Sequence, residues 1–186
     1  VVAAFVTDLV LDAGQLRALE LTSPPNVHVV EGFSGGTEDV IFRGNGREVF
    51  VSAPNFNDAT KPGGIFLVDV ERRSVRNVTP PEWLEPGKLQ PHGLDLWRGP
   101  GGEERLFLVN HPGGSALPSA AGQSGHEASH AVEIFDVASD GSLTHVKSVS
   151  HELMLSPNDV AAVGPDAFYL SNDHGYAGGL LRTLED

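Results

Sequence analysis

The sequence contains three repeats, and this repetition constrains the fold more than any other feature. Each repeat has an apolar run, a short turn rich in glycine or proline, and a second apolar run, an arrangement that predicts a pair of antiparallel strands. Equivalent positions are 38, 92 and 158, which lie 54 and 66 residues apart. Two further apolar runs follow the first two pairs, at 65–70 with 74–78 and at 131–137 with 143–149. Each complete repeat is therefore expected to form four strands.

Four-stranded units that repeat along a chain are typical of the blades of a β-propeller. The spacings of 54 and 66 residues exceed the roughly 40 to 50 residues of such a blade, and long loops explain the excess. We therefore expect an all-β fold in which an N-terminal segment, 1–25, with helical character near 12–21, precedes a partial propeller domain at 26–186. About two and a half blades cannot close around a channel, so the remaining blades are expected from the rest of the polypeptide or from another chain. The expected blades are blade 1 at about 37–80, blade 2 at about 90–150 and an incomplete blade 3 at about 156–186, in which 178–184 begins a third strand.

The charge of the chain limits its partners. With 25 acidic and 12 basic residues, the formal net charge is −13. Such a charge repels phosphate backbones, so nucleic acid is not an expected partner. An acidic excess most often reflects only a solvated surface. Cation sites built from oxygen ligands also add acidic residues to a sequence. The absence of cysteine excludes disulfides, thiolate zinc sites and cysteine nucleophiles.

The residues best suited to chemistry stand at the start of the first strand of each repeat. In a propeller this strand lines the channel, so equivalent positions converge on one axis: Glu38, His92 and Asn158. The next position supplies Asp39 and Asp159 as a second layer. Carboxylate and amide oxygens without thiolates suit Ca²⁺ better than Zn²⁺. The structural alternative is that these side chains only cap turns where the strands begin.

Two histidines of the second repeat are expected to lie near each other. His92 begins one strand and His111 follows the end of the next. Because imidazole titrates near neutral pH, such a pair can act as a general base with a neighbour that tunes it. A single histidine in a loop, by contrast, is more often structural or solvated.

One further histidine motif is set aside. Residues 126–130 read His-Glu-Ala-Ser-His and match the zinc pattern H-E-x-x-H. That pattern requires both histidines on one face of a helix. Here it lies at the end of a stretch typical of loops and runs into the apolar run at 131–137, so we do not assign a zinc site to it.

The chain contains five short motifs, at 36–39 (GTED), 90–93 (QPHG), 109–112 (VNHP), 157–165 (PNDVAAVGP) and 171–174 (SNDH). In their order and similar spacing these motifs resemble the paraoxonase family of arylesterases and lactonases. The resemblance runs from about Val27 to Tyr176 and covers the first half of that family's six-bladed propeller. It implies a calcium-dependent hydrolase of lactones and aryl esters, with organophosphate triesters as slower substrates in some members, and an extracellular or secreted protein.

The resemblance also implies a role for individual residues. The family's other catalytic-calcium ligands come from later blades, so catalysis by this chain in isolation is not expected, whereas the structural site can be complete. The implied roles are ligation of a catalytic calcium by Glu38 and Asn158, ligation of a deeper structural calcium by Asp39, Asp159 and the main-chain carbonyl of Leu94, activation of water by the His92–His111 dyad, and support of the ligands by Asp173 and His174.

Two alternatives stay open. A gluconolactonase-like hydrolase also has six blades, but it uses one metal and lacks the Glu-Asp and Asn-Asp pairs. A non-catalytic, calcium-stabilised propeller fragment would act as a binding or assembly module. It would be stabilised by calcium without hydrolysing esters or lactones.

Overall fold

The computed structural model describes residues 24–55, 58, 61–112 and 130–176. The helical stretch expected at 12–21, the strand expected at 178–184 and residues 126–129 of the histidine motif lie outside these ranges. In the described part, no helix is long and apolar enough to cross a membrane. The elements are β1 (Val40–Phe42), β2 (Glu48–Ala53), β3 (Gly64–Asp69), β4 (Ser74–Asn77), the 3-10 helix η1 (Pro81–Trp83), β5 (Pro91–Arg98), β6 (Glu104–Asn110), β7 (Ala131–Val137), β8 (Leu143–Val149), β9 (Pro157–Gly164) and β10 (Ala167–Asn172).

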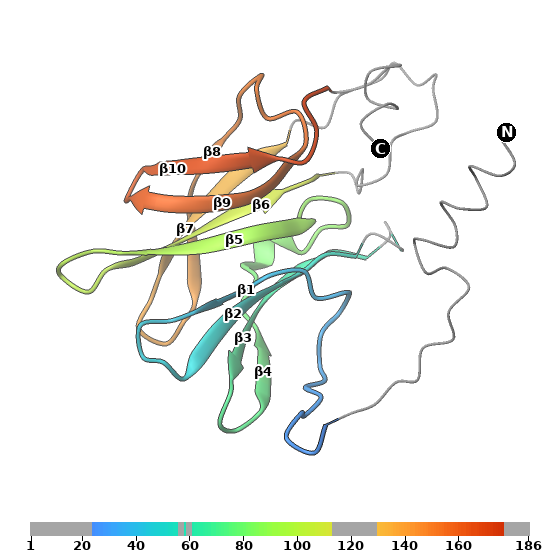
Figure 1. Cartoon of the computed structure of the whole chain (residues 1–186), viewed down its shortest axis with the longest axis vertical. Helices are drawn as coiled ribbons and strands as arrows, with labels where there is room; N and C mark the ends of the chain where they lie inside the picture. The colour runs from blue at the N-terminus through green and yellow to red at the C-terminus, as the bar shows by residue number, and fades with distance from the viewer. Residues whose placement is uncertain (1–23, 56–57, 59–60, 113–129, 177–186) are drawn as a thin grey trace, which may run out of the picture.

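The strands form two four-stranded antiparallel sheets and one strand pair. The sheets have the orders β1-β2-β3-β4 and β5-β6-β7-β8, and β9 pairs with β10. Figure 1 shows β9, β5 and β1 following one another from the top of the view downward, as the first strands of three successive units. The predicted all-β fold with four-stranded blades is therefore confirmed, and the described residues form an open arc without a closed ring.

The turn between β7 and β8 shows why glycine is needed between strands. Gly141 has a φ of +81°, which L side chains rarely adopt. A Cβ at this position would also lie 2.5 Å from the Cδ2 atom of Leu67 on β3. The turn of the second sheet therefore packs directly against the first sheet.

Strand β6 buries both of its faces, because successive side chains of a strand point to opposite sides. Leu106 and Leu108 join the core cluster that also contains Phe50 and Ile65 of the first sheet. Their neighbours on β6 join a second cluster with Val160 of β9. The middle sheet is thus packed between the other two units, as a propeller blade is packed between its neighbours.

The outer faces of the arc are covered unequally. In the first sheet, Val49 and Val51 pack with Phe33, which belongs to the segment before β1. At the other end, the free face of β9 and β10 leaves Val163 and Tyr169 at 59% and 73% exposure. Large apolar side chains this exposed on a sheet face are typical of a surface that another element covers.

A buried arginine joins the first two sheets. Arg43 is 7% exposed, and its Nη2 atom lies 2.6 Å from Glu104 Oε2 on β6. Its Nη1 atom lies 3.1 Å from Glu48 Oε2 on β2. The same guanidinium donates to the carbonyl of Ala138 in the β7–β8 turn. A buried guanidinium needs such partners, because removal from water is costly for an unpaired charge.

Aspartate side chains join successive inner strands. The Leu94 N–H on β5 donates to Asp39 Oδ2 over 2.8 Å, which joins the segment leading into β1 to β5. The Ala162 N–H on β9 donates to Asp95 Oδ2, also over 2.8 Å, which joins β5 to β9. The inner strands of neighbouring units are thus held together by side-chain to main-chain hydrogen bonds.

Candidate functional site

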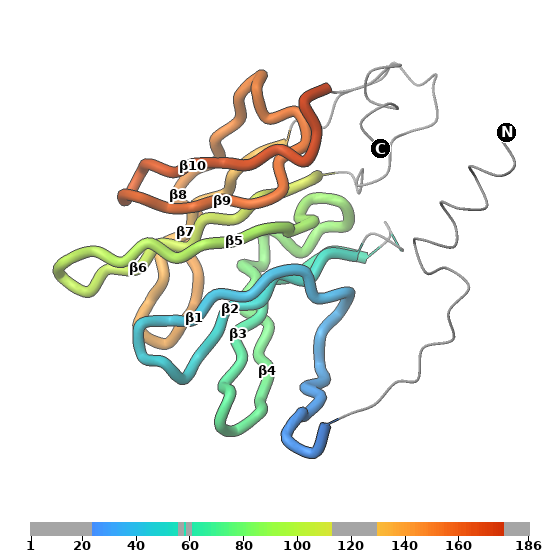
Figure 2. Tube along the Cα trace, viewed as in Figure 1, coloured from blue at the N-terminus to red at the C-terminus, as the bar shows by residue number. Residues whose placement is uncertain are grey.

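The residues predicted to converge lie at one end of the inner strands. In Figure 2 the turns after β1, β5 and β9 lie on the left of the view, so these three strands begin on the opposite side. Strand β1 begins at Val40, two residues after Glu38. The Glu38 N–H nevertheless donates to the Ser52 carbonyl on β2 over 2.9 Å, which keeps Glu38 in line with the sheet.

His92 lies between the other two members of the first predicted layer. Its Nδ1 atom is 3.0 Å from the main-chain oxygen of Asn158, and its Nε2 atom is 3.3 Å from Glu38 Oε1. A carbonyl oxygen can only accept, so Nδ1 carries a proton and donates it. In a neutral ring Nε2 then has no proton and faces a carboxylate. A ring nitrogen and a carboxylate that face each other as acceptors form an environment that favours a cation.

The second predicted layer lies along Gly93 and Leu94. Asp39 binds the Leu94 N–H from one side. From the other side β9 comes so close that a Cβ on Gly93 would lie 2.5 Å from both Asn158 O and Asp159 Oδ1. The structure therefore brings Asp39 and Asp159 to the two sides of one dipeptide, which only glycine at position 93 permits.

The side chain of Asn158 is oriented by a carboxylate. Its Nδ2 atom donates to Asp173 Oδ2 over 3.0 Å. Because a carboxylate only accepts, this contact fixes the amide with its nitrogen toward Asp173 and leaves Oδ1 as the group for other partners. Asp173 is itself held where β10 ends, since its N–H donates to the Ser156 carbonyl. His174 follows it and is half-buried.

His111 is buried at 6% exposure and packs its ring against that of His92, with 5.1 Å between ring centroids and 79° between planes. Its Nδ1 atom lies 2.8 Å from Nδ1 of His130. Burial is the main cause that lowers the pKa of His111 to about 4, and His130 and His92 act in the same direction. Burial also lowers the pKa of His130. The predicted dyad is therefore a row of three imidazoles, with an uncharged His111 in the middle at neutral pH.

His130 is the residue that sequence reasoning missed as a neighbour of the site. The signal for it was the strand pairing: β6 ends at Asn110 and β7 begins at Ala131, and these two residues are register partners. The residues just beyond the pair, His111 and His130, must then face each other across the start of the loop.

The donor set is the right kind for a hard cation. It consists of the carboxylates of Glu38, Asp39 and Asp159 with the amide oxygen of Asn158, and Ca²⁺ prefers such oxygens. Among the described residues, however, no group of three or more histidine, aspartate or glutamate side chains is placed to hold a metal by itself. The residues fit calcium in chemistry, and they supply only part of the 6 to 8 ligands that it takes.

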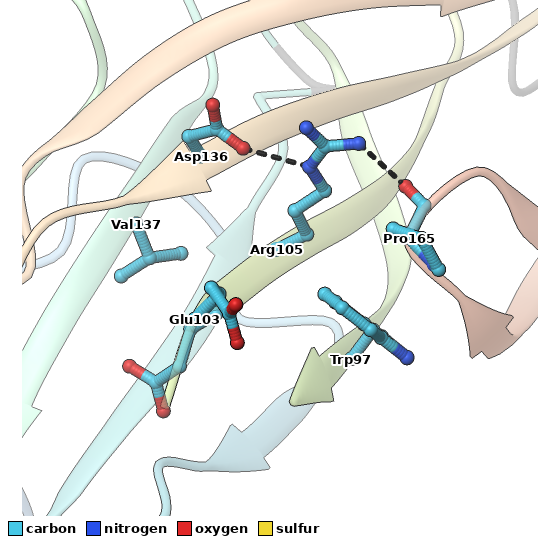
Figure 3. A pocket seen from close by; sticks show the side chains of 7 residues that line it. Trp97, Glu103, Arg105, Asp136, Val137 and Pro165 are labelled. Carbon is cyan, nitrogen blue, oxygen red and sulfur yellow. Dashed lines mark hydrogen bonds and ion pairs between the residues drawn. The ribbon is translucent and has the colours of Figure 1, made fainter. Parts of the chain in front are cut away.

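A pocket elsewhere in the molecule is separate from this site. It is lined by Trp97, Arg105 and Pro165, among others, and Arg105 donates there to Asp136 and to the Pro165 carbonyl (Figure 3). Trp97 stands five positions beyond His92 on β5, so at a rise of about 3.3 Å per residue the pocket is roughly 16 Å from the histidines. Its arginine already has protein partners, and we assign it no ligand.

Comparison with known proteins gives a consistent picture. A family model described as arylesterase matches residues 18–186. The serum paraoxonase/arylesterase 2 of Bos taurus is 32% identical over 177 residues, which are 91% of this chain and 46% of that protein. The serum paraoxonase/arylesterase 1 of Mus musculus is 32% identical over 188 residues, with 92% and 48% covered. The serum paraoxonase/lactonase 3 of Mus musculus is 31% identical over 179 residues, with 91% and 46% covered. The chain thus spans less than half the length of these relatives.

Proposed function

The chain belongs to the arylesterase family, and from this premise we propose that the protein hydrolyses aryl esters and lactones at the site formed by His92, Glu38 and Asn158. The observation that supports this proposal most directly is the state of His92. The main-chain oxygen of Asn158 holds its Nδ1 proton, so the unprotonated nitrogen of a neutral ring is Nε2. That nitrogen faces the acidic side of the site and is the group that can accept a proton from water.

The proposed reaction is a direct attack by water. Nε2 of His92 takes one proton from a water molecule while the water oxygen forms a bond to the carbonyl carbon of the ester or lactone. The tetrahedral intermediate then expels the alcohol or phenol oxygen, which takes the proton back from His92. Over the two steps one proton passes from water through His92 to the leaving oxygen, and no covalent bond to the protein is formed.

Calcium is part of the proposal. Glu38 and the Oδ1 atom of Asn158 would hold a catalytic ion, and Asp39, Asp159 and the Leu94 carbonyl would hold a structural one. A bound calcium supplies a Lewis acid for the negative charge on the carbonyl oxygen. Around it, Asp173 keeps Oδ1 of Asn158 turned away from itself, and the buried, uncharged His111 supports the ring of His92 without adding a positive charge beside it.

We also propose that further blades complete the propeller. Val163 and Tyr169 at one end of the arc, and Val40 and Phe42 at the other, are exposed at 53% or more. We expect further blades, from the same polypeptide or another chain, to cover these faces and to complete the calcium shell. The relatives are named as serum proteins, which supports an extracellular location.

The test uses the chain together with the remaining blades of the propeller, and it measures hydrolysis of phenyl acetate and δ-valerolactone with and without a calcium chelator. His92→Asn is the informative variant, because an asparagine amide can still donate to the Asn158 carbonyl but offers no base at the position of Nε2. We expect kcat to fall by about 10²- to 10⁴-fold, the usual contribution of a general base. His28→Asn is the matched control, because His28 is exposed in the segment before β1, and its kcat should not change.

Two results would count against the proposal. Full activity of His92→Asn would remove His92 from the mechanism. Stabilisation by calcium without hydrolysis of either substrate, with the remaining blades present, would favour the non-catalytic module instead.

A further inference from the structure

The contact between His111 and His130 has a defined direction. Their Nδ1 atoms are 2.8 Å apart, and the ring centroids are 4.6 Å apart. A hydrogen bond between two imidazole nitrogens needs one protonated and one unprotonated atom. The contact therefore fixes the tautomers of both rings relative to each other.

The main-chain carbonyl of Pro157 indicates which ring is the donor. It acts to raise the pKa of His111, so it favours a proton on the side of the ring that faces it. Nδ1 of His111 faces His130, which leaves Nε2 as the nitrogen whose proton this carbonyl favours. In a neutral His111 with its proton on Nε2, Nδ1 is an acceptor, and His130 donates its own Nδ1 proton to it.

The titratable groups that act on His111 come from three parts of the fold. His92 comes from β5, His130 from the residue before β7, and Asp173 from the end of β10. His111 itself is 6% exposed. A ring that is buried at this level and shares a hydrogen bond with His130 cannot rotate without breaking it.

We infer that His130 is a positioning residue, which holds His111 in the Nε2–H tautomer and in the orientation that packs on His92. The inference rests on the proposed function insofar as it concerns hydrolysis. His130 does not touch the ester. It acts through His111, whose ring lies against His92.

Three substitutions separate the possible roles of His130. His130→Asn keeps an N–H donor close to the position of Nδ1. His130→Asp offers only an acceptor, so His111 must place a proton on Nδ1, and its Nε2 then either faces the Pro157 carbonyl without a proton or takes a second one. His130→Leu removes the hydrogen bond altogether.

The direct readout is the tautomer of His111, measured by NMR on protein labelled with ¹⁵N in histidine. We expect the Nε2–H pattern in the wild type and in His130→Asn, and the Nδ1–H or doubly protonated pattern in His130→Asp. In the hydrolysis assay, kcat should fall by about 10- to 100-fold in His130→Asp and His130→Leu, the usual effect of losing a partner that orients a functional histidine. KM should stay unchanged, and His130→Asn should keep kcat within about threefold of the wild type.

The outcomes distinguish this inference from the proposed function. An unchanged His111 tautomer in His130→Asp would overturn the inference, as would a loss in His130→Asn equal to that in His130→Leu. If the wild type hydrolyses no ester, the proposed function fails, and the NMR readout still decides whether His130 positions His111.

Discussion

The burial of an uncharged His111 predicts that the protein loses stability in mild acid. Its pKa is lowered to about 4 in the folded protein, against 6.5 for an ordinary imidazole, chiefly because the ring is buried. Between these two values the unfolded chain binds a proton that the folded chain does not. The free energy of unfolding therefore rises with pH in this window. The contribution of His111 to it is lost as the pH falls from about 6.5 toward 4.

The size of the effect follows from the shift. The fall of the pKa from 6.5 to about 4 is worth about 3 kcal/mol in total, and most of this is already lost at about pH 4.5. For a domain with a total stability of about 5 to 15 kcal/mol this is a large share.

The assay is urea unfolding at pH 7 and at pH 4.5, followed by tryptophan fluorescence, with a chelator present so that the release of a cation does not contribute. His111→Asn removes the titrating ring, and its loss of stability between the two pH values should be smaller than that of the wild type by roughly 2 kcal/mol. The carboxyl groups of Asp69, Asp140 and Asp166, whose pKa values are lowered by hydrogen bonds, titrate equally in both proteins and cancel. His151→Asn, at an exposed position, should behave as the wild type. Equal acid sensitivity of His111→Asn and the wild type would refute the reasoning.

Two further predictions concern stability. In Gly93→Ala the new Cβ would meet Asn158 O and Asp159 Oδ1 at 2.5 Å, so we expect a loss of about 1–3 kcal/mol in urea unfolding and weaker calcium binding by calorimetry. Gly36→Ala, whose Cβ would meet no atom within 4 Å, is the control, and equal effects of the two changes would contradict the close approach of β9. Arg43→Met leaves the carboxylates of Glu48 and Glu104 without their buried cation, so stability should fall by about 3–5 kcal/mol. A double variant that also carries Glu104→Gln should recover part of this loss, and no recovery would show that the ion pair is not the cause.

Sequence reasoning predicted the strands well because each depends on local signals. The run 131–137 is apolar and lies between turn residues, and β7 has these bounds. The meeting of Glu38, His92 and Asn158 was predictable for a different reason, namely that equivalent positions of a repeat occupy equivalent places in the fold.

Other features could not be read from the sequence because they depend on how two blades pack. Arg43 and Glu104 are 61 residues apart, and nothing in either local pattern indicates that they form a buried pair. Glu133 is similar, because it lies in an apolar strand and is only 3% exposed. Its carboxylate forms hydrogen bonds with His145 and Asn110, which the local sequence does not indicate. For His130, the contact with His111 follows from the pairing of β6 with β7, and the H-E-x-x-H motif that contains it does not indicate this contact.

The aspartate links between inner strands have a consequence for the width of the molecule around its axis. Asp39 and Asp95 each offer one carboxylate oxygen to an amide of the next unit, so a side chain, and not strand pairing, sets the gap between neighbouring inner strands. One extra methylene at either position would push two whole units apart while every hairpin keeps its register. Exchange of aspartate for glutamate at these two positions is thus expected to widen the spacing of neighbouring units around the axis without changing any strand pair.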